Sequence, residues 1–247
     1  MPTETSSLEL VGVLDELTPE KEKYSDALKA AGEGFVEAYN IFQDADFVTK
    51  KGWKSELSKD DATVHSKNLS FGHVFALRTT LPVPIDIAFR ESFLNFDDLA
   101  TWSENITFSK TIAKLTDHVD VVHYANPDVA VVQSREFLVA RIWRKVDDDI
   151  YVSARSVKLE HVPTAKGRTR GHLHLGCARF SPDPTDANKT TIDYLLSIDL
   201  KGLIPKAIVN LTMAKIILKD FTETKKHYAN VLASENAQTH ELEHHGV

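Results

Sequence analysis

The chain has 247 residues, of which 42% are apolar and 26% are charged, and its formal net charge is −7. This apolar fraction can build a sizeable core, and the acidic balance argues against a nucleic-acid partner, which would require a basic surface. The lone Cys177 cannot form an internal disulfide, which is typical of a reducing compartment. No signal peptide is visible, and no apolar run approaches the ~20 residues of a membrane span. We therefore expect a cytoplasmic monomer.

The chain opens with an extension and a helix. Residues 1–17 are acidic and polar, which predicts a tail or an extra short helix. A helix start follows at residues 18–20, where Thr is the N-cap and Pro occupies the first turn. Apolar residues then recur at spacings of three and four over residues 24–42, which predicts a long helix with one buried face.

The apolar period changes from helical to alternating after residue 52. The predicted strands cover residues 53–58, 62–68, 73–81, 106–115, 118–125, 135–146, 150–157, 170–181 and 190–200. Between the third and fourth strands, residues 85–95 predict a short helix and residues 97–104 a helical turn. The pattern indicates an α+β protein with one large antiparallel sheet. A sheet of about nine strands must twist and curl strongly.

The stretch from Tyr194 to Leu218 begins as a strand and becomes a helix. Gly202 provides a flexible break between them, and Pro205 falls in the first turn of the helix. Apolar residues recur along the helix at spacings of three and four, and further apolar residues widen this stripe. A helix this apolar either packs into a core on two sides or covers an apolar molecule.

The segment LLSIDLKGLIPKAIVN, residues 195–210, resembles the C-terminal signature of START (StAR-related lipid transfer) domains. The resemblance is strongest to the sterol-binding subgroup, although Leu203 replaces its tryptophan. SREFLVAR at 134–141 and the turn at 102–105 are similar to the family as well. The resemblance implies a helix-grip fold, in which a curved antiparallel sheet is closed by a long C-terminal helix over an apolar cavity. The resemblance covers roughly residues 50–233. With the elements upstream, we divide the chain into a polar N-terminal extension (1–17), a START lipid-binding domain (18–233) and a polar C-terminal tail (234–247).

Arg141 lies in the middle of the apolar strand FLVARIW. A buried, unpaired guanidinium is costly, so this side chain needs a partner. The resemblance places Arg141 at the cavity arginine of the family, and the position of its acidic partner corresponds to Tyr124. A phenol can accept a hydrogen bond but cannot neutralise the charge. The partner is then Glu136, Asp120, another carboxylate or the polar end of a ligand.

The resemblance, the parity of the strands and the stripe of the last helix together predict a ligand-binding set. Its members are Arg141, Tyr124, Asn105, Leu99, Val152, Tyr194, Leu196, Ile198, Phe137, Val139, Leu218 and Phe221. Trp102 is expected to support the turn rather than to contact ligand. No cofactor and no metal are expected. The resemblance implies a hydrophobic small molecule as ligand, either a cholesterol-type sterol or a carotenoid.

Residues 125–134, ANPDVAVVQS, lie where the family has a flexible Ω-type loop beside the C-terminal helix. Val129, Val131 and Val132 make this loop unusually apolar. Two interpretations remain open: a loop packed into the core, or a gate that opens in transient contact with a membrane surface. The lysines near the last helix either approach anionic lipid or form a solvated edge. They are Lys201, Lys206, Lys215 and Lys219.

The sequence gives less support to the hypothesis that the protein is an enzyme. HELEH at 240–244 matches the zincin motif, but it lies in a polar tail without an apolar face. His172 and His174 share one face of a strand without a cysteine or carboxylate cluster to complete a metal site. We therefore expect an intracellular lipid-binding and transfer protein rather than an enzyme. The alternatives are a hydrolase or thioesterase-associated module that uses the same cavity, and a lipid-sensing regulatory module.

Overall fold

The computed structural model describes residues 5–129, 132–202 and 206–245. Its strands are β1 Ser7–Leu10, β2 Val13–Glu16, β3 Lys54–Lys59, β4 Ala62–Leu69, β5 Gly72–Leu81, β6 Phe108–Lys114, β7 Val119–Ala125, β8 Arg135–Val146, β9 Asp149–Ser156, β10 Thr169–Arg170, β11 His172–Pro182 and β12 Thr190–Asp199. Its helices are η1 Pro19–Tyr24, α1 Ser25–Gln43, α2 Ala45–Thr49, α3 Ile85–Phe89, η2 Arg90–Leu94, η3 Phe96–Asp98, α4 Leu99–Trp102 and α5 Lys206–His245. Of these, η1 and η3 are 3-10 helices and η2 is a π-helix.

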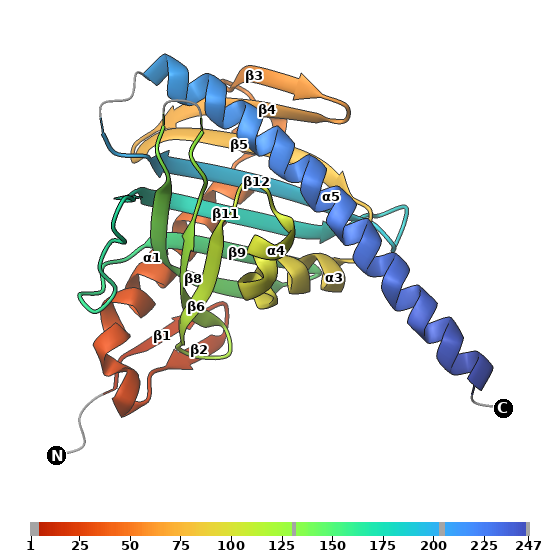
Figure 1. The fold of residues 1–247 in the computed structure, drawn as a ribbon, viewed down its shortest axis with the longest axis horizontal. Coiled ribbons are helices and arrows are strands. Elements are labelled where there is room, and N and C mark those ends of the chain that lie inside the picture. Colours follow the sequence, from red (N-terminus) through yellow and green to blue (C-terminus); the bar gives the residue numbers. More distant parts are fainter. Residues whose placement is uncertain (1–4, 130–131, 203–205, 246–247) are drawn as a thin grey trace.

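The large sheet has the strand order β3-β4-β5-β12-β11-β9-β8-β7-β6, and the short β10 pairs with β8 (Figure 1). Neighbours along the main path are antiparallel, whereas β10 and β8 run parallel. Each of the nine strands predicted from the sequence is present, with ends that differ by two residues at most. The predicted α+β class and helix-grip architecture are confirmed. Within this sheet, the two-residue β10 is the one strand that the alternation of apolar and polar residues did not predict.

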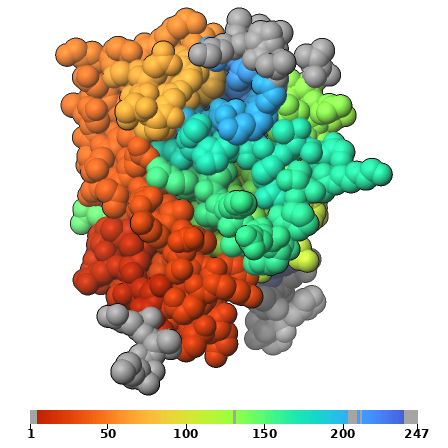
Figure 2. Space-filling view, turned by 90° about the vertical axis from the view of Figure 1, so that its left-hand side faces the viewer, coloured from red at the N-terminus to blue at the C-terminus, as the bar shows by residue number. Residues whose placement is uncertain are grey.

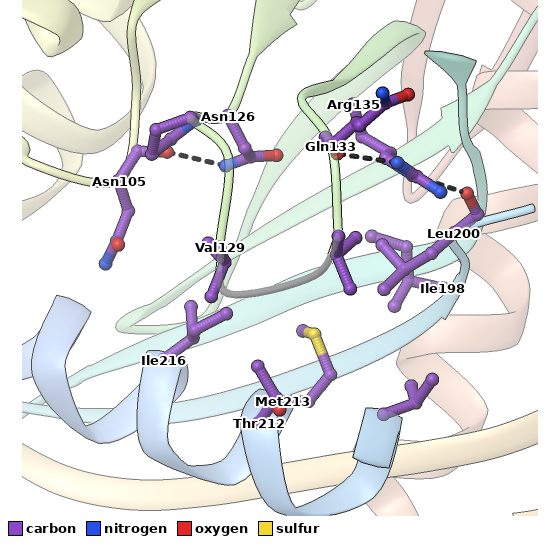
Figure 3. A pocket seen from close by; sticks show the side chains of 13 residues that line it. Asn105, Asn126, Val129, Gln133, Arg135, Ile198, Leu200, Thr212, Met213 and Ile216 are labelled. Carbon is purple, nitrogen blue, oxygen red and sulfur yellow. Dashed lines mark hydrogen bonds between the residues drawn. The ribbon is translucent and has the colours of Figure 1, made fainter. Parts of the chain in front are cut away.

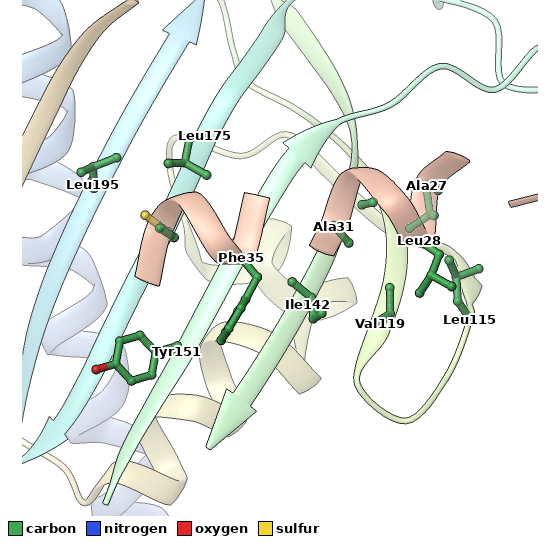
Figure 4. Packing of buried hydrophobic residues seen from close by; sticks show 14 of the residues in the cluster. Ala27, Leu28, Ala31, Phe35, Leu115, Val119, Ile142, Tyr151, Leu175 and Leu195 are labelled. Carbon is green, nitrogen blue, oxygen red and sulfur yellow. The ribbon is translucent and has the colours of Figure 1, made fainter. Parts of the chain in front are cut away.

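Strand alternation divides the sheet into two apolar faces. On β8, Leu138, Ala140 and Ile142 belong to the cluster that packs against α1, part of which Figure 4 shows. Phe137 and Val139, on the opposite parity, belong to the cluster that packs against α5. Since successive side chains of a strand point to opposite faces, an apolar run such as FLVA must be covered on both sides. The helix α1 covers one face of the sheet, and α5 covers the other.

The helix α1 lies close to its neighbours at its glycines. Phe35 packs edge-on against Tyr151 of the sheet, with ring centroids 6.4 Å apart. A Cβ atom added at Gly32 would lie 2.7 Å from the Leu8 side chain of β1. Gly32 therefore makes room for the N-terminal strand, and its low helix propensity is offset by packing.

Residues 7–16 form a β-hairpin, so the prediction of a tail or short helix there is wrong. The turn uses Val11 and Gly12 at positive φ, a two-residue geometry for which Asn-Gly is the usual sequence signal. Asp15 of β2 forms an ion pair with Arg144 of β8, and each residue is 1% exposed. In Figure 2 the dark red hairpin lies against the orange-red residues of α1.

The C-terminal helix also differs from its prediction. Residues 234–245, expected in a polar tail, continue α5, which crosses the sheet diagonally and projects beyond it (Figure 1). The side chains of the HELEH segment, 240–244, lie outside the described residues. Lys201 and Gly202 both have positive φ and form the bend after β12. Among the described helices, none is long and apolar enough to cross a membrane.

The buried ion pair of the hairpin should contribute strongly to stability. We expect Asp15→Ala to lower the free energy of unfolding by about 3–5 kcal/mol, because it leaves Arg144 buried without its counter-charge. Chemical denaturation would measure the loss. The exposed Glu9, on the other strand of the hairpin, is the control, and Glu9→Ala should change stability by less than about 0.5 kcal/mol. Equal effects of the two substitutions would contradict the assignment.

Candidate ligand-binding cavity

A cavity lies between the concave face of the sheet and α5. Its volume is about 290 Å³, at the lower end of the ~300–1,000 Å³ typical of ligand pockets. Sheet strands, the segment from η2 to the turn after α4, and α5 all contribute to its wall. The lining is mostly apolar and includes Phe96, Val122, Leu173, Phe180 and Ile192. Such a wall suits a hydrophobic molecule with few polar atoms.

The structure places most of the predicted ligand-binding set in this wall. The lining members are Arg141, Tyr124, Leu99, Val152, Tyr194, Leu196, Val139 and Phe221. Phe137 and Leu218 belong to the adjoining apolar cluster rather than to the lining. Asn105 and Ile198 line a separate, smaller pocket. The parity argument on β8 and β12 thus finds the correct face, but it does not separate lining residues from those behind them.

Arg141 has a carboxylate partner on the neighbouring strand, and that partner is Asp120. The two residues are directly opposite in the β7–β8 ladder. Arg141 Nε donates to Asp120 Oδ1 at 2.9 Å, and Nη2 donates to Oδ2 at 2.6 Å. The interpretation that Tyr124 stands in place of the acid is therefore wrong. Of the alternatives left open by the sequence, the register of the ladder selects Asp120 rather than Glu136.

The remaining surroundings of Arg141 also belong to the protein. Nη2 donates a further hydrogen bond to the backbone oxygen of Phe93 at 3.0 Å. The guanidinium carbon lies 4.1 Å from the ring centroid of Phe93 and 4.4 Å from that of Phe96, within cation–π range. Arg141 is only 5% exposed. Its charge is thus neutralised and covered in the absence of a ligand.

Glu136, near the start of β8, forms an ion pair with a residue other than Arg141. Arg170 of β10 donates to Glu136 Oε1 at 2.8 Å, and the side chain of Glu136 is fully buried. The backbone N–H of Ala165 also donates to this carboxylate, at 3.2 Å. Glu136 therefore secures the segment before β10.

A further carboxylate, Asp220 of α5, is half-buried and meets the turn after α4. Asn105 Nδ2 donates a short hydrogen bond to it. Burial raises the pKa of Asp220 from 3.8 to about 6; nearby Glu223 also raises this pKa, whereas Asn105 and Lys219 oppose the shift. A fraction of Asp220 is consequently protonated near neutral pH.

The end of the cavity near η2 contains residues that the sequence prediction missed. Glu91 and Tyr228 line it, and Glu91 lies 3.0 Å from Nε2 of His227. Trp102 also lines the cavity and stacks on His227, with ring centroids 4.1 Å apart and an interplanar angle of 5°. Tyr228 follows Phe221 by seven residues, so extending the helical stripe would have found it. Glu91 gives no comparable sequence signal.

The loop between β7 and β8 lies beside the N-terminal half of α5. Val129 and Val132 exchange two backbone hydrogen bonds, of 2.8 and 2.9 Å, so this segment extends the β7–β8 hairpin. Both side chains line a pocket of 70 Å³ against Met213 and Ile216 of α5 (Figure 3). Val131, the third predicted gate residue, lies outside the described residues. The contact between loop and helix is apolar.

Arg135 joins this loop to the bend before α5. Its guanidinium donates to the backbone oxygens of Gln133 at 2.6 Å and Leu200 at 2.9 Å (Figure 3), and also to that of Lys201 at 3.1 Å. The same side chain is 7% exposed. The end of the loop and the start of the bend therefore share one hydrogen-bonding centre.

The described residues contain no group of three or more His, Cys, Asp or Glu side chains placed to hold a metal. His172 and His174 contact each other, with ring centroids 4.7 Å apart. Cys177 is buried in the cluster on the α1 side of the sheet, and burial raises the pKa of its thiol. Cys177 also borders the cavity, and the raised pKa of its thiol keeps it in the unreactive protonated form.

The pairing of Arg141 with Asp120 makes a clear prediction for stability. Arg141→Leu should lower the free energy of unfolding by about 3–5 kcal/mol, since Asp120 would remain buried without its partner. Replacing both residues by Leu should restore most of this loss, because an apolar pair removes both desolvated charges. Denaturant titration of the two variants measures the difference. A single variant as stable as the wild type would show that the pair is not structural.

Asp220 predicts a pH-dependent difference in stability. Its folded-state pKa of about 6 exceeds the unfolded value, so its contribution is fully present below pH ~4 and is lost as the pH rises through 6. Asp220→Asn keeps an acceptor for Asn105 but cannot ionise. The free energy of unfolding of this variant, taken relative to that of the wild type, should rise by on the order of 1–3 kcal/mol between pH 4 and pH 7. The same substitution at the exposed Asp86, Asp86→Asn, is the control for the chemical change itself, and an equal pH-dependent difference in both variants would contradict the assignment to Asp220.

Comparison with known proteins agrees with this geometry. The START domain family matches residues 35–233. The chain is 38% identical to steroidogenic acute regulatory-like protein 1 of Caenorhabditis elegans over 229 residues, which cover 92% of this chain and 88% of that protein. It is 28% identical to the steroidogenic acute regulatory protein of Xenopus laevis over 192 residues, covering 76% and 66% of the two chains.

A solved structure shares the fold. Human StAR-related lipid transfer protein 5 superimposes with a TM-score of 0.74 at 18% sequence identity, covering 84% of this chain and 99% of the other. At this identity the likeness concerns the fold alone. The family match spans most of the chain, including the strands that line the cavity and most of α5. The chain belongs to the START domain family.

Proposed function

We propose that this protein binds one hydrophobic lipid in the cavity under α5 and transfers it between membranes. The observation that carries the proposal is the mostly apolar cavity, whose few charged groups are paired within the protein. The names of the relatives point the same way, since they include steroid-related regulatory proteins and a lipid transfer protein. A cholesterol-type sterol and a carotenoid are the two ligand classes that we put forward. We place this activity inside the cell and in a monomer.

We propose the loop at 125–134 and the N-terminal half of α5 as the gate. Their contact is apolar, through Val129 and Ile216, and leaves a small pocket. The middle of α5 is instead held by polar bonds to the turn after α4: Glu104 N–H donates to Glu223 at 3.1 Å, and Lys219 Nζ donates to Glu104 at 2.6 Å. Separation at the apolar contact breaks fewer polar bonds.

A transient membrane contact fits the same end of α5. Lys201, Lys215 and Lys219 are all exposed, and Lys201 and Lys219 also form ion pairs with acidic neighbours. The side chain of Lys206 lies outside the described residues. Exposed lysines that are partly neutralised by acidic neighbours support weak attraction to anionic lipid rather than tight binding.

A hydrolase is the second candidate, and the cavity gives it little support. Hydrolysis through a Ser–His pair needs the hydroxyl within hydrogen-bond reach of the imidazole. In the described part of the cavity, Ser92 donates to the backbone oxygen of Phe89 at 3.2 Å, and His227 Nε2 lies by Glu91. Binding without catalysis is therefore the function that the cavity favours. A lipid-sensing regulatory role would use the same cavity.

Extraction of the purified protein followed by mass spectrometry tests the proposal. We expect one lipid at a stoichiometry near one per chain, and a visible absorption band if the lipid is a carotenoid. Protein stripped of lipid should then carry sterol or carotenoid from donor to acceptor vesicles. Absence of bound lipid, together with no transfer above the rate in protein-free controls, would rule out the proposed function.

A cross-link tests the gate. Val129→Cys with Ile216→Cys should slow transfer between vesicles when oxidised, because the loop can no longer leave α5, and reductant should restore the rate. Vesicle transfer assays under both conditions give the measurement. The matched control is Glu104→Cys with Glu223→Cys, which ties a contact that is already polar and should leave the rate unchanged. Equal rates for oxidised and reduced Val129–Ile216 protein would place the gate elsewhere.

A further inference from the structure

The sheet strands contribute two phenol hydroxyls to the cavity wall. They are the hydroxyls of Tyr124 and Tyr194, for which the described part of the chain offers no hydrogen bond. Burial raises the pKa of both phenols, so both remain neutral at physiological pH. A neutral phenol can donate one hydrogen bond and also accept.

The two rings approach the cavity from separate parts of the sheet. Tyr124 on β7 stacks on Phe137, with centroids 5.2 Å apart, and meets Phe96 edge-on at 6.0 Å. Tyr194 on β12 meets Phe221 of α5 edge-on at 5.2 Å. In the strand order, β11, β9 and β8 separate the two strands. Packing on both rings restricts their rotation, so the hydroxyl positions are set before any ligand enters.

The carboxylate of Asp220 acts on the pKa of both phenols. Its negative charge helps to raise the pKa of both Tyr124 and Tyr194, and Asn105 holds its carboxyl group. An anionic ligand head beside the phenols would be repelled by this charge, and the Arg141 guanidinium, which acts on Tyr124 in the opposite sense, is already paired with Asp120. The surroundings therefore favour an uncharged oxygen over a carboxylate or phosphate.

Burying a hydroxyl without a hydrogen-bond partner is unfavourable. Since neither hydroxyl is bonded to a described residue, its partner is expected among the contents of the cavity. We propose that Tyr124 and Tyr194 form a polar subsite that binds a hydroxyl or keto oxygen of a neutral lipid. The inference rests on the proposed function and narrows its ligand to oxygenated lipids, as opposed to pure hydrocarbons.

Two matched probe pairs test the subsite: cholesterol with cholestane, and zeaxanthin with β-carotene. Within a pair the members differ chiefly in their hydroxyl groups. The wild-type protein should bind the oxygenated member of at least one pair more tightly. Tyr124→Phe and Tyr194→Phe should each weaken binding of that member by about 2- to 12-fold, as expected for one neutral hydrogen bond. Binding of the hydrocarbon member should stay unchanged.

Tyr151→Phe is the matched control, because Tyr151 is a buried tyrosine on the α1 face of the sheet, outside the cavity. The Tyr151→Phe variant should still bind the oxygenated probe more tightly than the hydrocarbon probe. A wild-type protein without preference, or phenylalanine variants that keep the full preference, would overturn the subsite while leaving lipid binding standing; water would then satisfy the phenols. Failure of all four probes to bind would overturn both the subsite and the proposed ligand classes. Melting temperatures of the variants establish that each is folded.

Discussion

The structure depends on a strongly curled antiparallel sheet that is apolar on both faces. Side chains of one strand alternate between the faces, so Leu138 and Val139, adjacent in sequence, lie in different clusters. Each face must be removed from water, and each takes one long helix. The helix α1 packs closely on one face, where a Cβ atom added at Gly34 would lie 3.1 Å from the Ser153 hydroxyl of β9. The other face curls away from α5, and a cavity remains between them.

Buried charge is handled in the same way throughout the described interior. Arg141 meets Asp120, Arg144 meets Asp15, and Glu136 meets Arg170. Each pair joins two different strands, and removing one partner would leave the other charge buried without its counter-ion. The phenols on the cavity wall differ, since they are neutral and lack a protein partner. This contrast separates polar groups that hold the fold together from those available to a ligand.

The helix α5 has two kinds of contact along its length. Near its start, Met213 and Ile216 pack against the loop after β7 through apolar side chains. Further along, Asp220, Glu223 and His227 form polar contacts with the segment from η2 to the turn after α4. Apolar contacts can separate without leaving unsatisfied hydrogen-bonding groups, whereas polar ones cannot. One helix therefore makes an apolar contact in one region and polar contacts in another.

The sequence by itself determined the nine long strands, the two long helices and the bend at Gly202. These features follow from local periodicity and from residues with restricted or permissive backbones, which act over a few positions. It also assigned Tyr124, Val139 and Tyr194 to the correct face of the sheet. The hairpin at residues 7–16 was missed because its turn lacks the usual residues.

Tertiary structure alone decided which side chains meet. The partner of Arg141 depends on the register between β7 and β8, and a register one residue away would present a different side chain to Arg141. Trp102, His227 and Glu91 come together only after α5 folds back across the sheet. Contacts of this kind join positions more than a hundred residues apart, and no local pattern records them. Which residues line the cavity is therefore decided by the folded chain.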